Sequence, residues 1–278
     1  MPAALVARAA AAGVEVLSLT DHDTIAGYAS ASDEAVARGV QLVTGIEITA
    51  VLGDVDVHVL GYFIDTHCAS LLEFLAEQRR MRIERVREMV ARLAALGVQV
   101  DAEAILAPGL DDAAKAAGRP WIARALVDAG WVATTNEAFD RWLGRGRPAF
   151  VPRAGVPPAT VFDHVHRAGG LASLAHPGLT RCDEHVPSFV EAGLDAIEVY
   201  HSKHDAEATA RYHELSRRLG LAVTGGSDYH GDEVHSTAAL GTVSLPRAAF
   251  DRLVALNTRT PPSKPAFEPG TRRANHAP

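Results

Sequence analysis

The stretch Val14-Glu15-Val16-Leu17-Ser18-Leu19-Thr20-Asp21-His22-Asp23-Thr24 decides the fold class. Apolar and β-branched residues favour a buried strand over residues 14–20, and the strand ends in a histidine flanked by two aspartates. A helix is predicted before it at 3–12, and another after it at 25–38, where Gly39 ends the pattern. Strands follow at 40–44, 46–51 and 55–63. Strands that alternate with helices predict an α/β fold with parallel units.

The pattern changes in the middle of the chain and then resumes. A long amphipathic helix is predicted at 70–96, with five arginines on its solvent face, and shorter helices at 101–106, 120–129 and 135–143; the arginines are Arg79, Arg80, Arg82, Arg85 and Arg87. Helices at 157–168, 186–192, 205–219 and 246–256 then alternate with strands at 171–175, 196–200, 222–225 and 239–244. We therefore expect barrel segments at 1–67 and 153–257, an all-helical insertion at 68–152, and a flexible tail at 258–278.

The composition limits the function. A net charge of −7, from 27 basic and 34 acidic residues, argues against a basic surface that wraps a nucleic acid. No apolar run approaches the roughly 18 residues of a membrane span, and the N-terminus lacks the features of a signal peptide. The two cysteines, Cys68 and Cys182, have no metal-binding spacing and indicate a reducing compartment. We expect a cytoplasmic protein without an obligate protein partner.

Histidines and carboxylates follow the ends of several predicted strands. His22 follows the first strand, and His176, His201 and Asp228 follow later ones, with His230 two residues further on. Because the carboxyl ends of parallel strands meet at one rim, these side chains are predicted to form a site. Each motif alone has a simpler explanation as a helix cap or a turn, but their joint occurrence favours a functional rim.

A hairpin adds two further candidates. If Leu52-Gly53 is the turn, Glu47 and His58 lie directly opposite each other, about 4.5–5.5 Å apart at Cβ, and can hold one divalent cation. The other face then packs into the interior, with Ile46, Ile48, Val55, Val57 and Val59. The alternative is an isolated Glu–His ion pair on a solvent-exposed strand.

Imidazoles and carboxylates without cysteine favour Mn, Fe or Zn. More ligands than one ion needs, with a carboxylate able to bridge, indicate a multinuclear centre of the kind that activates water for phosphoryl displacement.

Five motifs resemble the PHP (polymerase and histidinol phosphatase) family in order and spacing. They are Leu19-Thr20-Asp21-His22-Asp23-Thr24, Gly45-Ile46-Glu47, Val57-His58-Val59-Leu60-Gly61-Tyr62, Ala175-His176-Pro177-Gly178 and Gly226-Ser227-Asp228-Tyr229-His230-Gly231. Residues 119–126 and 138–144 look like the helical insert of the branch that hydrolyses nucleoside 3′,5′-bisphosphates and trims short RNA from its 5′ end. The resemblance spans about residues 3–256. It implies a distorted (β/α)₇ barrel with up to three metal ions, commonly Mn.

The resemblance also implies roles for individual residues. Glu47 would bridge two metals, with His58 and His176 on one ion and Asp228 on the next, while His22 and His230 would belong to the third. Glu47 and Asp228 would thus be central to catalysis. Asp21 would orient an imidazole as a supporting partner. Substrate phosphates are expected at Arg119, Arg124, Arg147, His201 and Lys203.

One departure from the family concerns the N-terminus. Family members open with a His-x-His strand followed by Ser-Asp-Gly, and this sequence contains neither, so the first barrel strand and three ligands are missing from it. We expect a reading frame that extends upstream of Met1 rather than a decayed enzyme, because six ligand positions are retained.

The sequence therefore predicts a metal-dependent phosphoesterase that acts on nucleoside 3′,5′-bisphosphates or on the 5′ ends of short oligonucleotides through an activated hydroxide. The alternatives are a histidinol-phosphate-type phosphatase and a non-catalytic metal- or nucleotide-binding module. An amidohydrolase is a weaker alternative, because no lysine is placed after a strand to serve as a carboxylated metal bridge.

Overall fold

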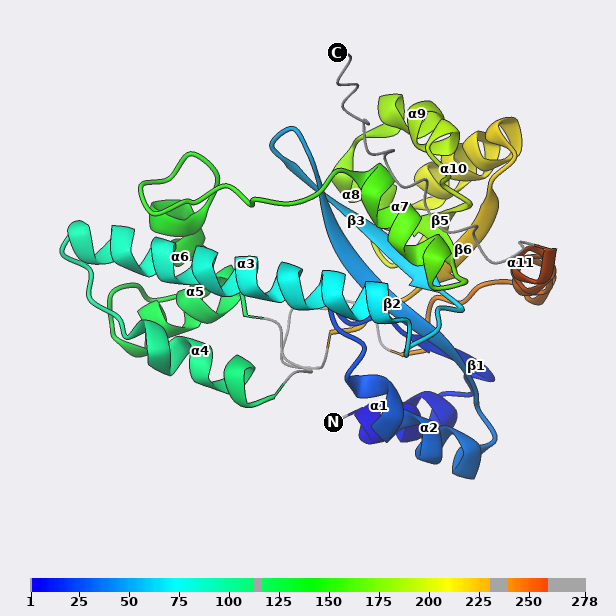
Figure 1. The fold of residues 1–278 in the computed structure, drawn as a ribbon, viewed down its shortest axis with the longest axis horizontal. Helices are drawn as coiled ribbons and strands as arrows, with labels where there is room; N and C mark the ends of the chain where they lie inside the picture. Colours follow the sequence, from blue (N-terminus) through cyan, green and yellow to red (C-terminus); the bar gives the residue numbers. More distant parts are fainter. Residues whose placement is uncertain (1, 113–116, 231–239, 260–278) are drawn as a thin grey trace, which may run out of the picture.

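The structure is a computed structural model that describes residues 2–112, 117–230 and 240–259. Its centre is one six-stranded sheet in the order β1-β2-β3-β4-β5-β6. The strands are β1 (Val16–Leu19), β2 (Gln41–Leu52), β3 (Val55–Tyr62), β4 (Leu171–Leu174), β5 (Ala196–His201) and β6 (Ala222–Gly226). β3 runs antiparallel to both its neighbours, and the other pairs are parallel. The sheet curls into a distorted, open barrel with helices around it (Figure 1), which confirms the α/β fold class.

Helices were predicted well. They are α1 (Pro2–Ala11), α2 (Gly27–Arg38), α3 (Ala69–Ala95), α4 (Ala102–Asp111), α5 (Arg119–Asp128), α6 (Thr135–Ala138) with a π-helical turn at Phe139–Leu143, α7 (Pro158–Arg167), α8 (Pro177–Thr180), α9 (Val186–Glu191), α10 (Ala206–Leu219) and α11 (Arg247–Arg259). The strand expected at 239–244 is wrong over 240–244, which form turns and bends, and residue 239 lies outside the described residues. In the described part of the chain, no helix is both long and apolar enough to cross a bilayer.

The two strands predicted at 40–44 and 46–51 are one strand, β2. Gly45 lies within this strand and does not end it. A glycine is needed at this position because β2 approaches Leu19 and Thr20 closely there. A Cβ at this position would lie 2.9 Å from the Leu19 carbonyl oxygen and 2.9 Å from the Thr20 methyl group. The missing side chain lets β1 pass close to β2.

The hairpin register differs from the prediction. The loop is Gly53-Asp54, and Leu52 pairs with Val55, so Thr49 lies opposite His58 and Glu47 opposite Leu60. Gly53 has φ of +60°, and glycine at the first position of a two-residue hairpin loop is the type II′ preference. Val55 therefore closes the turn and is 38% exposed, not part of the core. Glu47 and His58 remain on one face as diagonal neighbours, because the register shifts by an even number of residues.

The outer face of the hairpin forms the main core. Ile46, Ile48, Val57 and Val59 are fully buried against residues of α3, α7 and α10. Because side chains alternate along a strand, this packing turns Glu47, Thr49 and His58 toward the barrel interior. The apolar pattern of the hairpin thus sets the direction of its polar side chains.

The helices between β3 and β4 have an apolar core of their own. The C-terminal half of α3 packs with α4, α5 and α6 through residues such as Met89, Leu106 and Leu126, and Figure 1 shows these helices beyond the far end of the sheet. This separate core supports the proposal that residues 68–152 are an insertion into the barrel.

A pH-dependent contact links α7 to the loop before β5. His166 Nε2–H donates a 2.7 Å hydrogen bond to Asp195 Oδ2, and this bond raises the pKa of His166. The contribution of this bond to stability is therefore complete below the pKa of an unfolded histidine, about 6.5, and is lost as the pH rises through the pKa of His166 in the folded protein. We expect His166→Gln to lower the free energy of unfolding in urea by ~1.5–3 kcal/mol at pH 5.5 and by less at pH 9.

The control for this prediction is His67→Gln, because the His67 side chain is 93% exposed. An equal loss for His166→Gln at both pH values would refute the proposed charge-dependent contact.

Candidate metal centre

Strand ends bring the predicted histidines and carboxylates to one rim of the barrel. The loop after β1 continues alongside β2, where Glu47 N–H donates to the Asp21 carbonyl and Asp23 N–H donates to the Glu47 carbonyl. This places His22 beside Glu47. His176 follows β4 directly, and Asp228 lies two residues beyond β6.

Glu47 stands at the centre of three imidazoles. Its Oε1 lies 2.8 Å from His58 Nδ1 and 3.2 Å from His176 Nε2, and its Oε2 lies 3.5 Å from His22 Nδ1. The glutamate is only 4% exposed. One buried carboxylate therefore connects a side chain of β3 with side chains that follow β1 and β4.

The charges of this group depend on one another. Burial opposes ionisation of Glu47, but hydrogen bonds from His176 and His58 outweigh it and hold the pKa of Glu47 well below its usual range. Burial likewise opposes protonation of His176, yet the hydrogen bond to Glu47 raises the pKa of His176. The pKa of His22 is lowered, mainly by burial. Glu47 is thus an anion that attracts cations into the site.

A second group lies beside the first and is centred on Asp228. Lys203 N–H donates to His201 Nδ1 at 3.1 Å, which leaves the proton on Nε2 to donate to Asp228 Oδ2 at 3.4 Å. His230 Nδ1 lies 3.4 Å from Asp228 Oδ1. Burial alone would raise the pKa of Asp228, but the His201 hydrogen bond and the nearby His230 lower it.

Three of the five described non-glycine residues with positive φ lie at this rim. Asp23, His176 and Asp228 have φ values of 54°, 28° and 51°, in the left-handed region that side chains with a Cβ disfavour. Non-glycine residues are held in such conformations where the surrounding structure forces them, often at functional sites. The strain supports the assignment of this rim as the site.

The donor set fits a divalent metal. Ligand atoms of His22, Glu47 and His58 all lie within 4.8 Å of one another. The buried Nδ1 atoms of His22 and His176 form no hydrogen bond, so nitrogen lone pairs are open to a cation. Imidazole nitrogens with carboxylate oxygens suit Mn, Fe or Zn, and no cysteine lies in this group to favour a softer ion.

Asp21, expected to support an imidazole, precedes His22. Burial raises the pKa of its carboxyl, and the charge of His230 partly offsets this effect. The supporting role of Asp21 stays a prediction.

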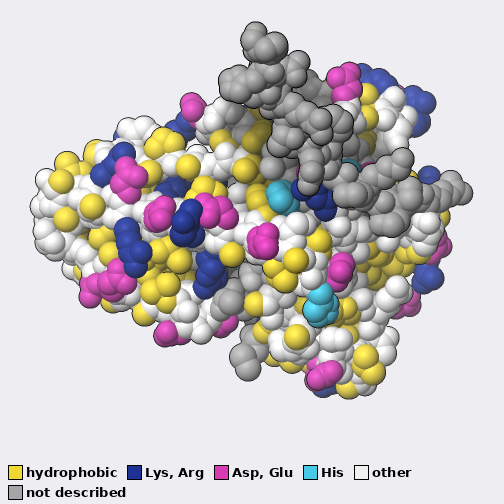
Figure 2. All heavy atoms as spheres, in the orientation of Figure 1, with side chains coloured by type: hydrophobic (Ala, Val, Ile, Leu, Met, Phe, Trp, Pro, Cys, Tyr) yellow, Lys and Arg dark blue, Asp and Glu magenta, His cyan; other side chains and the backbone are white. Residues whose placement is uncertain are grey.

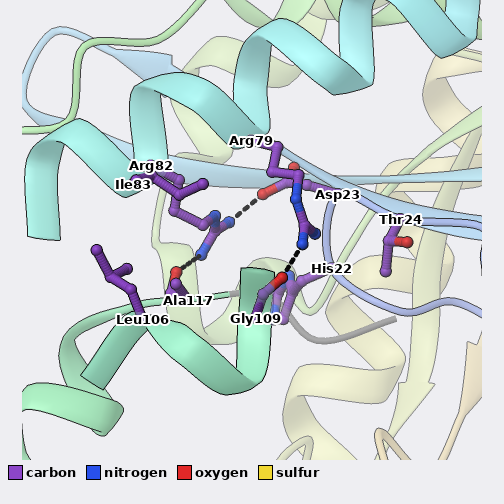
Figure 3. Close-up of a pocket in the computed structure, with 9 residues that line it drawn as sticks. All are labelled: His22, Asp23, Thr24, Arg79, Arg82, Ile83, Leu106, Gly109 and Ala117. Atoms are coloured by element: carbon purple, nitrogen blue, oxygen red, sulfur yellow. Dashed lines mark hydrogen bonds and ion pairs between the residues drawn. The ribbon is translucent and has the colours of Figure 1, made fainter. Parts of the chain in front are cut away.

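Beside this centre lie four arginines, of which the sequence predicted Arg119 as a phosphate contact but not Arg82, Arg85 or Arg153. We call Arg82, Arg85, Arg119 and Arg153 the arginine cluster. The Arg82 guanidinium forms an ion pair with Asp23, next to His22, and Arg153 lies 3.8 Å from Asp23 Oδ2 and 3.6 Å from Asp56 Oδ2. Figure 3 shows Arg82 on α3 pointing toward Asp23 and Ala117. The prediction that Arg82 and Arg85 face solvent is wrong.

The arginine cluster carries more positive charge than its carboxylate partners neutralise. Burial, together with the neighbouring Arg153 and Arg119, lowers the pKa of Arg85 to about 10. Burial, with Arg82 nearby, also lowers the pKa of Arg153. The buried Nε atoms of Arg82 and Arg153 form no hydrogen bond. Open donors and unbalanced charge make the cluster suited to an anion such as a phosphate.

The other predicted substrate residues lie in different surroundings. Arg119 belongs to the arginine cluster, with its guanidinium 5.7 and 5.8 Å from the ring centroids of Phe139 and Phe150. Arg124 is exposed and pairs with Asp128 at 3.1 Å, and Arg147 and Lys203 are also exposed. His201 is buried against Asp228. The structure thus brings Arg119 and His201 to the site, whereas Arg124, Arg147 and Lys203 are surface residues whose roles stay predictions.

A stability prediction follows for Asp23. Its Oδ1 accepts the Thr49 N–H at 3.0 Å, and its Oδ2 faces two buried guanidinium groups. We expect Asp23→Ala to lower the free energy of unfolding by ~3–5 kcal/mol, because buried charges lose their partner. Asp54→Ala is the control. Asp54 also pairs with an arginine, at 2.6 Å, but is 78% exposed, so its loss should cost at most ~1 kcal/mol. Equal losses in urea unfolding would contradict the prediction.

Comparisons with known proteins agree with this chemistry. No family model matches the chain. The chain is 31% identical over 255 residues to the 3′,5′-nucleoside bisphosphate phosphatase of Chromobacterium violaceum, covering 88% of this chain and 89% of that protein. It is 32% identical over 242 residues to the 5′-3′ exoribonuclease Rnm of Escherichia coli, covering 82% and 80%. A Bifidobacterium adolescentis structure described as a metal-dependent phosphoesterase superposes with a TM-score of 0.81 at 31% identity, covering 92% and 90%. The chain belongs to the PHP family of phosphoesterases.

Proposed function

We propose that this phosphoesterase hydrolyses nucleoside 3′,5′-bisphosphates or the 5′ ends of short oligonucleotides, with Mn²⁺ as its metal. The observation that carries the proposal is a metal centre with the arginine cluster beside it: Asp23, which binds Arg82, directly follows His22 in the chain. A substrate with two phosphate groups matches two adjacent sites, one for the reacting phosphate and one for the other.

Six residues would hold the metal ions. They are His22, Glu47, His58, His176, Asp228 and His230, which together suffice for more than one ion. A divalent cation supplies an activated water at neutral pH and neutralises the phosphoryl oxygens. The family resemblance implies up to three ions when the ligands of an additional strand are present.

The protein's own residues orient the centre and the substrate. Glu47 joins the imidazoles of His22, His58 and His176 and fixes their positions relative to one another. His201 keeps its proton on Nε2 and directs it at Asp228, which fixes the carboxylate. Asp23 anchors Arg82 so that the guanidinium cannot swing toward the metal ligands. The arginine cluster then binds the phosphate that does not react, and this binding aligns the reacting one.

The surface charges favour small substrates. On the face shown in Figure 2, basic and acidic side chains are interspersed over the helical insertion, with no continuous basic track. Together with the net charge of −7, this argues for a mononucleotide or a short end rather than a long nucleic acid. Arg124, Arg147 and Lys203 would make secondary contacts at most. The two free cysteines support the cytoplasm as its location.

Histidinol phosphate is the competing substrate, and the arginine cluster argues against it. That molecule carries an ammonium group where a bisphosphate carries its second phosphate, and a positive cluster would repel it.

The test is a side-by-side comparison of three substrates with Mn²⁺ present. We expect kcat/KM to be highest for a nucleoside 3′,5′-bisphosphate or a 5′-phosphorylated dinucleotide and at least about 100-fold lower for histidinol phosphate, since like-charge contacts cost several kcal/mol. Faster hydrolysis of histidinol phosphate would refute the proposed substrate class.

A further inference from the structure

Glu198 is a buried carboxyl group that the proposed mechanism does not use. It lies on β5 between Ile197 and Val199 and is only 5% exposed. It lines the same groove as Glu47, His176 and Asp228. In the described part of the chain, no lysine or arginine side chain forms an ion pair with it.

Burying such a group is costly. A carboxylate without a cation partner loses its hydration and gains little in return. Burial accordingly raises the pKa of Glu198 to about 7, although His201 and the N–H of His176 partly offset this effect. Glutamine, leucine or methionine has a side chain of similar length, so packing at this position does not require an acid.

Among the described residues, the Glu198 side chain forms one hydrogen bond, and this bond explains its presence. Its Oε2 accepts the backbone N–H of His176 at 2.8 Å. His176 has φ 28° and ψ 58°, in the left-handed region, and it precedes Pro177. A residue before proline is restricted to extended conformations, so the backbone of His176 is strained for two independent reasons.

The remaining contacts fix the neighbours of His176 rather than its amide. Ala175 N–H donates to the His58 carbonyl at 3.0 Å, and Leu179 N–H donates to the His176 carbonyl at 2.9 Å. Within residues 2–112, 117–230 and 240–259, Glu198 is the one acceptor for the N–H of His176. The orientation of the His176 backbone sets the direction in which its side chain leaves the chain. The His176 Nε2 atom lies 3.2 Å from Glu47 Oε1.

We propose that Glu198 is a positioning residue that holds the strained backbone of His176 so that its imidazole faces Glu47, and that it thereby increases the affinity of the centre for its metal. The inference rests on the proposed metal centre, but not on the substrate. Glu198 acts through a hydrogen bond to the backbone and is neither a metal ligand nor a catalytic residue.

Two variants of matched size separate the hydrogen bond from packing. Glu198→Gln keeps an oxygen that can accept the His176 N–H, whereas Glu198→Leu removes the acceptor. Ser173→Ala is the control, because Ser173 is fully buried in the same sheet and its hydroxyl bonds Thr224 Oγ1 at 2.8 Å rather than the His176 backbone. The measurements are the Kd for Mn²⁺ by calorimetry, on chelator-treated protein at one pH, and unfolding in urea.

We expect Glu198→Leu to bind Mn²⁺ about 10–100-fold more weakly, the usual effect of losing a partner that orients a ligand. The variant should nevertheless unfold at the same or higher urea concentration, because a costly buried acid has been removed. Glu198→Gln and Ser173→Ala should bind close to wild type.

Unchanged affinity in Glu198→Leu would overturn the inference, and so would an equal loss in both Glu198 variants. If Glu198→Leu does not fold, Glu198→Met, which also lacks an acceptor, takes its place against Glu198→Gln with the same expected and contradicting results. Wild-type protein that binds Mn²⁺ tightly but hydrolyses no phosphoester would contradict the proposed function and leave this inference standing.

Discussion

Replacing Glu47 by glutamine is expected to abolish metal-dependent turnover, with a fall in kcat/KM well beyond the ~10–100-fold that loss of a supporting residue costs. Among the described residues, Glu47 is the one carboxylate that pairs with the imidazoles of all three of His22, His58 and His176. A neutral amide cannot bridge cations or balance their charge. The measurement is phosphate release from a nucleoside 3′,5′-bisphosphate, together with Mn²⁺ binding by calorimetry.

The control for Glu47→Gln is Glu191→Gln, which makes the same chemical change at an exposed position on α9. It should bind Mn²⁺ and turn over like wild type. Near-normal activity of Glu47→Gln would refute the assignment of the centre.

Replacing Arg85 by methionine is expected to raise KM for a 3′,5′-bisphosphate by about 10–100-fold, the equivalent of one lost hydrogen bond to a charged group. Methionine keeps an unbranched apolar stem but removes the guanidinium that faces the rest of the arginine cluster. Arg85 Nε–H donates to the Val151 carbonyl at 2.9 Å, so the substitution removes one hydrogen bond. It also relieves the burial and like-charge repulsion that lower the pKa of Arg85, so the free energy of unfolding should change little. The measurement is steady-state kinetics.

Two comparisons make the Arg85 result specific. In Arg85→Met, KM for a monophosphate that lacks the second phosphate should change little. Arg217 forms an exposed ion pair with Glu214, and Arg217→Met should leave KM for both substrates unchanged. Equal losses on both substrates would show that Arg85 supports the metal centre or the fold rather than the second phosphate.

Much of the metal centre was predictable because strand ends are visible in the sequence. His22, His176 and Asp228 each follow an apolar run, and the topology of parallel strands brings such positions together. The hairpin register was less predictable. From the sequence, Gly53 could be the last or the first residue of the loop. The observed pairing of Leu52 with Val55 shows that it is the first. The contact between Glu47 and His58 survived the error because both registers leave them on one face.

Arg82 and Arg85 of the arginine cluster were missed because arginines on an amphipathic helix usually face solvent. A signal was nevertheless present in α3. Its buried residues Leu71, Leu75, Gln78, Val86, Met89 and Leu93 recur at helical spacing, and Arg82 and Arg85 fall on the same stripe. Charged residues inside an otherwise buried helix face indicate a polar partner opposite, here Asp23 on the barrel. Glu198 lies in β5, where every residue but the partly buried Tyr200 is buried, and it was missed although it shows the same signal.

The central claim is that this rim holds metal ions that hydrolyse phosphoesters. The most direct test measures metal content and turnover of a nucleoside 3′,5′-bisphosphate on one preparation, before chelation, after chelation and after addition of Mn²⁺. The account predicts turnover that disappears with the metal and returns when at least one Mn²⁺ per chain has rebound. Turnover that persists in metal-free protein, or protein that rebinds Mn²⁺ at this rim without hydrolysing the substrate, would contradict it.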